Sequence, residues 1–63
     1  MEKVLSEIEV EIEILRAKAV QFRMLAARHR EAENLPVAKK LLDVVGELEA
    51  KVVELQQLVR RAS

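Results

Sequence analysis

The sequence predicts an all-α protein: an antiparallel hairpin of two long helices that assembles into a four-helix bundle or a larger helical oligomer. Three observations predict it. The 63 residues include one Gly and one Pro, so long helices are interrupted at one place. Charged residues make up 35% of the chain and aromatic residues 2%, a composition typical of long helices and coiled coils. Apolar residues also recur at steps of three and four on both sides of the Pro.

The first helix is expected over about 3–33, where neither Gly nor Pro occurs. Its apolar stripe occupies positions a and d of a heptad, the pattern that a helix presents to a neighbouring helix. Ser6 and Glu9 form a possible capping box, which would begin the helix at Ser6. We favour a start near residue 3, because Val4 and Leu5 extend the stripe. The stripe residues are Leu5, Ile12, Ala19 and Ala26 at a, and Ile8, Leu15, Phe22 and His29 at d.

A turn is expected at 34–36. Pro36 disfavours a helical backbone at Leu35 and suits the first turn of a following helix. Asn34 either ends the first helix in the left-handed conformation or caps the second. A connection this short joins antiparallel neighbours, so the two helices should form a hairpin.

The second helix is expected over about 36–62, and its seam is wider than positions a and d alone. Val37, Val44 and Leu58 widen it on the g side and Leu42 on the e side, which favours a four-helix bundle over a two-stranded coil. Gly46 falls at b, outside the seam. It either allows the close approach of another backbone or is a tolerated surface glycine, and we favour the second interpretation. The seam residues are Ala38, Val45, Val52 and Val59 at a, and Leu41, Leu48, Leu55 and Ala62 at d.

Residues 1–63 are expected to form a single domain, and a chain this short needs a staple, a metal or a partner for stability. The absence of Cys excludes disulfides and Cys-based zinc sites. Two helices alone leave half of each wide stripe in water. We therefore expect self-association, as a homodimer or a larger oligomer. The predicted oligomer seam is Leu5, Ile8, Ile12, Leu15, Ala19, Phe22, Ala26, Leu41, Val45, Leu48, Val52, Leu55 and Val59.

The net charge is zero, but the charges are unevenly distributed. Residues 1–15 carry five Glu and one Lys, a net −4, whereas residues 16–30 carry five basic residues and no acid, a net +5. Residues 31–63 carry six acids and five bases, a net −1. Two copies of the first helix would therefore attract each other when antiparallel and repel when parallel.

The first helix also has apolar residues on its back, roughly opposite the seam. Val10, Ile14, Val20 and Met24 are the largest of them, with Ala17 and Ala27 nearby. A helix that is apolar on two sides is normally covered on two sides. These four residues are either scattered surface residues, which are common, or a second interface occupied by a further copy or by a helix of another protein. We favour the second interface, because Ile14, Val20 and Met24 are large.

The sequence carries no motif for catalysis, so we expect a protein that is not an enzyme and needs no cofactor. His29 and Glu33, one turn apart, are a poor ligand set, and no metal site is predicted. Zero net charge and the absence of an apolar run near 18 residues predict no membrane association. The glutamates of residues 2–13 argue against a signal or transit peptide, and we expect a cytoplasmic location.

The leading interpretation is a small oligomerisation and protein-interaction module that acts as an adaptor, a regulator or an assembly segment. One alternative is a dimeric RNA-binding regulator that uses Arg16, Arg23 and Arg30, which are spaced by seven on one helix edge. The absence of stacking aromatics disfavours that alternative, and e-position arginines commonly pair with a neighbouring helix. A second alternative is one helical subunit of a heteromeric complex.

Overall fold

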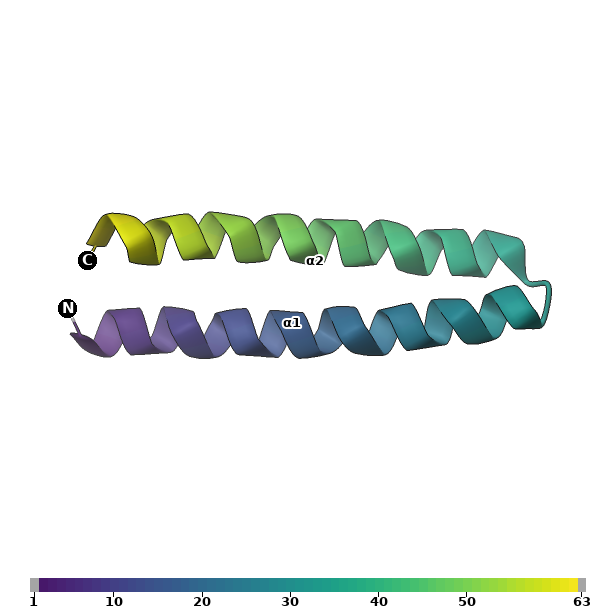
Figure 1. Ribbon diagram of the computed structural model, residues 1–63, viewed down its shortest axis with the longest axis horizontal. Coiled ribbons are helices and arrows are strands. Elements are labelled where there is room, and N and C mark those ends of the chain that lie inside the picture. Colours follow the sequence, from purple (N-terminus) through teal and green to yellow (C-terminus); the bar gives the residue numbers. More distant parts are fainter. Residues whose placement is uncertain (1, 63) are drawn as a thin grey trace.

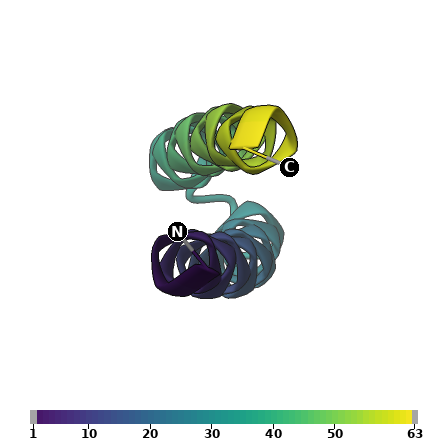
Figure 2. The ribbon, with the colours of Figure 1, turned by 90° about the vertical axis from the view of Figure 1, so that its left-hand side faces the viewer.

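Residues 2–62 are described by a computed structural model, which consists of helix α1 (Glu2–Glu31) and helix α2 (Leu35–Ala62). The two helices lie side by side and run antiparallel, so that the start of α1 and the end of α2 lie at the same end of the molecule (Figure 1). The molecule measures 47 × 14 × 10 Å. Viewed along the helices it is one helix beside the other, with no further layer within residues 2–62 (Figure 2). The prediction of an all-α antiparallel hairpin is confirmed.

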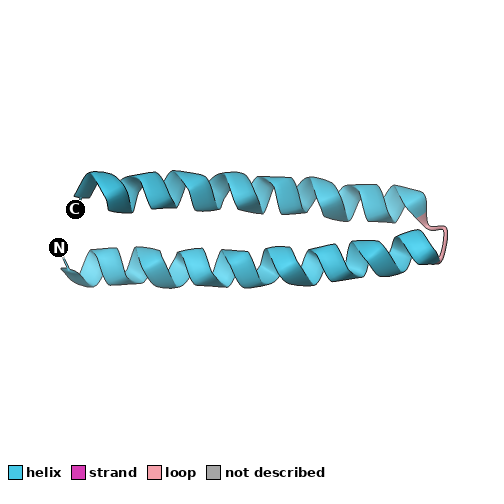
Figure 3. Cartoon of the chain, viewed as in Figure 1, coloured by secondary structure: helices cyan, strands magenta, loops and turns pink. Residues whose placement is uncertain are grey.

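The turn lies at residues 32–34, slightly earlier than expected (Figure 3). α1 ends at Glu31 rather than near residue 33, because two hydrogen bonds that depart from the α-helical pattern close its last turn. The backbone N–H of Glu33 donates to the carbonyl of Arg30 (3.0 Å), and that of Asn34 donates to the carbonyl of His29 (2.7 Å). This pair of bonds defines a Schellman motif. Its left-handed residue is Glu33, with φ of 61°, and not Asn34.

Asn34 caps the second helix, which was one of the two roles open to it. Its carbonyl accepts the backbone N–H of Ala38 (3.1 Å), the first hydrogen bond of α2. That bond closes a turn around Leu35, so the helix begins there, one residue before Pro36 and in spite of the bias that proline imposes. Pro36 has no N–H, and the first turn of a helix leaves its N–H groups without helical partners in any case.

The left-handed Glu33 predicts that Glu33→Gly stabilises the hairpin by about 1 kcal/mol, because an L-residue is strained in that conformation and glycine is not. Glu31→Gly is the matched control: it makes the same change at the last residue of α1, where glycine costs about 1 kcal/mol. Thermal melts followed by circular dichroism should therefore shift in opposite directions. A lower melting temperature for Glu33→Gly would contradict this assignment.

The core between the helices is centred on the a positions. Near the turn it consists of small side chains, with Ala26 and Ala38 only 1% and 4% exposed. Towards the open end Ile12, Leu15 and Val52 form one cluster. The partly buried residues that pack on this cluster are Ile8, Leu48, Leu55 and Val59. The seven buried residues are Ile12, Leu15, Ala19, Ala26, Ala38, Val45 and Val52.

The hairpin buries little for its length. Within residues 2–62, no large side chain is less than 2% exposed, and the most deeply buried residue is an alanine. No buried polar side chain lies in the core of these residues either. A pair of helices held only by this narrow core has little free energy of folding to spare.

Candidate interaction surfaces

The ion pair between Arg23 and Glu49 defines one broad face of the hairpin. Both residues occupy e positions, one on each helix, and their side chains meet across the two helices. The e positions of α1 and α2 therefore share a face, which we call the e face. A shallow groove on this face has Ala19 and Val52 on its floor and is flanked by Val20 and by Val53.

The g positions of both helices must then share the opposite broad face, which we call the g face. The d side chains lie on this side of the core, and most of them are only half-buried, because the helices contact each other chiefly through their a positions. Five of the eight g positions on this face are Val or Leu, and the other three are the exposed charged residues Glu11, Lys18 and Lys51. The apolar residues of the g face are half-buried Ile8, Phe22, Leu41, Val44, Leu48 and Leu55 with exposed Val4, Leu25, Val37 and Leu58.

All thirteen residues of the predicted seam lie on the inner side of the hairpin. Six of them are buried in the contact between α1 and α2: Ile12, Leu15, Ala19, Ala26, Val45 and Val52. The other seven are half-buried: Leu5, Ile8, Phe22, Leu41, Leu48, Leu55 and Val59. The single chain thus uses the a side of the seam for its own core and leaves much of the d side open.

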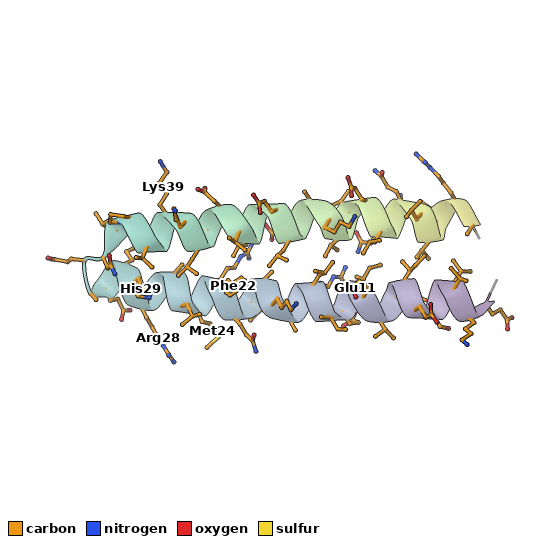
Figure 4. The ribbon with its side chains drawn as sticks, turned by 180° about the vertical axis from the view of Figure 1, so that it is seen from behind. Glu11, Phe22, Met24, Arg28, His29 and Lys39 are labelled. Atoms are coloured by element: carbon orange, nitrogen blue, oxygen red, sulfur yellow. The ribbon has the colours of Figure 1, made fainter. Side chains whose placement is uncertain are left out.

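The four residues of the predicted second interface are all exposed: Val10 59%, Ile14 44%, Val20 57% and Met24 56%. The structure does not bring them all onto one surface. Val20 lines the groove on the e face. Met24 lines a different shallow groove on α1 with Gln21, Leu25 and Arg28. Figure 4 shows Met24 and Arg28 pointing away from α2 along the outer edge of α1, and Lys39 pointing outward on the opposite edge of α2.

The arginines of the e positions, Arg16, Arg23 and Arg30, are all exposed. Arg23 is bound to Glu49 of α2, as expected of e-position charge that pairs with a neighbouring helix. Arg16 lies 3.7 Å from Glu13, one turn away on α1. These ion pairs are exposed and therefore contribute little to stability. They nevertheless place two of the three arginines beside acidic residues of the same chain.

His29 has a structural role at the turn, whereas nothing within the chain requires glycine at position 46. The side-chain amide of Asn34 donates to Nδ1 of half-buried His29 over 3.2 Å, which ties the end of α1 to the start of α2. Nothing lies within 4 Å of the position that a Cβ of Gly46 would occupy, so no close approach within the chain requires glycine there. Within residues 2–62, no group of three or more potential metal ligands comes together.

Neither helix within the described residues is long and apolar enough to cross a membrane. Comparisons of the chain with protein families, with curated proteins and with solved structures found no match.

The unequal character of the two broad faces was missed by sequence reasoning, although a signal for it exists. Five of the eight g positions from Val4 to Leu58 are Val or Leu, against two of the eight e positions from Glu9 to Gln56. In an antiparallel pair that difference makes one face apolar and the other charged. A seam that is considered as one stripe, widened on both sides, hides this difference.

Proposed function

We propose that this chain is a small non-enzymatic oligomerisation module, and that a second hairpin covers its g face to form a four-helix bundle. One observation carries the proposal: most d side chains are only half-buried, on a face whose g positions are largely Val and Leu. Covering such side chains would stabilise the assembly by roughly 25 cal/mol for each Å² of apolar area removed from water. An apolar face that spans both helices is typical of an interaction site.

A second copy of the same chain is the partner that the charges favour. Helix α1 carries −4 over residues 1–15 and +5 over residues 16–30, so two antiparallel copies of it attract along their whole length. On the g face itself, Glu11 and Lys18 occupy successive g positions of α1. An antiparallel second copy places Lys18 opposite Glu11, and the same pair recurs on the other side of the two-fold axis.

The proposal predicts that folding depends on protein concentration, because the single hairpin is under-buried. Circular dichroism melts over a hundredfold dilution should show a falling melting temperature, and sedimentation should show dimers or larger species that dissociate on dilution. A melting temperature and a monomeric mass that stay constant over this range would contradict self-association and would favour a heteromeric partner instead.

Leu58→Glu and Leu42→Glu test the face directly. Both leucines are exposed in the hairpin, at 49% and 39%, and both lie on α2. Leu58 occupies a g position and Leu42 an e position. Leu58→Glu should lower the mass by abolishing association through the g face, because it places an unpaired charge in an apolar contact. Leu42→Glu should leave the mass unchanged. Equal behaviour of the two variants would show that the g face is not the interface.

This proposal assigns the arginines of the e face no role in binding nucleic acid, because Arg16 pairs with Glu13 and Arg23 pairs with Glu49. RNA binding makes a different prediction, namely affinity that falls steeply with salt and is lost in Arg16→Gln/Arg23→Gln/Arg30→Gln. Titration of a fluorescent single-stranded RNA at two salt concentrations separates the two functions. We expect no binding at physiological salt.

A further inference from the structure

The outer edge of α1 carries a second apolar stripe that neither the core nor the g face uses. It lies at c and f positions, and on the helical wheel it is centred opposite the buried a and d residues. Val10, Ile14 and Met24 are 59%, 44% and 56% exposed, and Ala17 is exposed as well. Met24 and Arg28 point away from α2 along this edge (Figure 4). We call Val10, Ile14, Ala17, Gln21 and Met24 the outer stripe.

The outer stripe is close to symmetric about Ala17. Val10 and Met24 lie seven residues before and after it, and both are large and apolar. A small residue at the centre allows two helices to approach closely. The stripe is bounded at its two ends by opposite charges, Glu7 at a c position before Val10 and Arg28 at a c position after Met24. Glu7 and Arg28 are separated by about 32 Å along the helix axis, at ~1.5 Å per residue.

We infer that the outer stripe binds the outer stripe of a second copy, with the two α1 helices antiparallel and a two-fold axis at Ala17. Val10 of each copy then packs on Met24 of the other, and Ala17 lies against Ala17. Glu7 lies opposite Arg28 at both ends of the contact. A parallel arrangement would instead place Glu7 against Glu7 and Arg28 against Arg28, and the net −4 and +5 halves of α1 would each meet their like. Charge therefore selects the antiparallel arrangement.

This contact is separate from the proposed g-face dimer, because it uses the edge of the hairpin and not its broad face. Two different self-complementary surfaces on one chain link copies beyond a dimer, into a closed tetramer or an extended row. The outer-stripe contact does not require the g-face dimer, so either one can fail without the other.

Cysteine pairs test the contact and its direction, since the chain has no native cysteine. Val10→Cys and Met24→Cys variants should cross-link when mixed under mild oxidation, and each should cross-link little by itself. Ala17→Cys should cross-link with itself, because a residue on a two-fold axis meets its own copy. Gln57→Cys, at an exposed f position of α2, gives the background of random collisions. Self-cross-linking of Val10→Cys, or yields equal to that background for all variants, would overturn the inference.

A charge swap gives an independent test. Glu7→Arg alone or Arg28→Glu alone should weaken the outer-stripe contact roughly tenfold, because each change turns both end pairs into like-charge pairs. The double variant Glu7→Arg/Arg28→Glu should restore it. The readout is the yield of the Ala17→Cys cross-link at limiting protein concentration, with the mass of the g-face dimer measured in parallel. Equal yields in the single and double variants would overturn the proposed register while leaving the proposed function standing.

Discussion

Replacing Leu15 by alanine is expected to lower the free energy of unfolding by about 3 kcal/mol, because it removes buried methyl groups and leaves a cavity. Leu15 is 9% exposed and belongs to the cluster with Ile12 and Val52. These neighbours come from both helices, so the site cannot collapse without moving one helix relative to the other. Urea unfolding at low protein concentration, followed by circular dichroism, measures the loss in the single hairpin.

Two further variants make this result interpretable. Leu35→Ala removes the same atoms from a leucine that is 60% exposed, and should change the free energy of unfolding by less than about 0.5 kcal/mol. Leu15→Met conserves the volume of the side chain and should cost less than about 1.5 kcal/mol, which keeps the protein folded if Leu15→Ala does not fold. Similar losses for Leu15→Ala and Leu35→Ala would show that this cluster does not hold the helices together.

The two helices and their antiparallel arrangement could be predicted from the sequence because one feature decides each. Uninterrupted spacing of three and four residues specifies a helix, and the single Pro, two residues after Asn34, leaves one place for a turn. The details of the turn were less predictable. Asn34 is the residue type expected in the left-handed conformation, yet Glu33 adopts it. The Schellman hydrogen bonds set that position. They depend on where α1 ends and leaves backbone carbonyl groups without helical partners, and not on the conformational preference of one residue.

The candidate surfaces were predicted less completely, because a heptad pattern does not say how far one helix is rotated against another. Phe22 and Leu48 occupy d positions of the predicted seam, and both are only half-buried in the hairpin. The contact is centred on a positions, where Ala19, Ala26 and Ala38 are small enough for the backbones to approach. This rotation turns the larger d side chains toward the g face. It is a consequence of packing between the two helices, and no single-helix pattern contains it.

Phe22→Ala should have separate effects on the stability of the single hairpin and on the association of two hairpins. In the single hairpin Phe22 is half-buried, and we expect a loss of about 1–2 kcal/mol, below the ~3–5 kcal/mol of a fully buried phenylalanine. In the proposed four-helix bundle, the second hairpin would cover the rest of the ring. The dimer contains two such rings, so its dissociation constant should rise roughly 100-fold, at about 1.4 kcal/mol for each factor of ten.

Sedimentation equilibrium measures the dissociation constant, and unfolding at the lowest workable concentration measures the single hairpin. Phe22→Leu is the conservative control, because leucine retains most of the apolar area and should raise the dissociation constant far less. An alanine variant that loses the full ~3–5 kcal/mol in the dilute hairpin, with no change in association, would place the whole ring inside the single chain. That result would leave the g face without its largest contact residue and would count against the bundle.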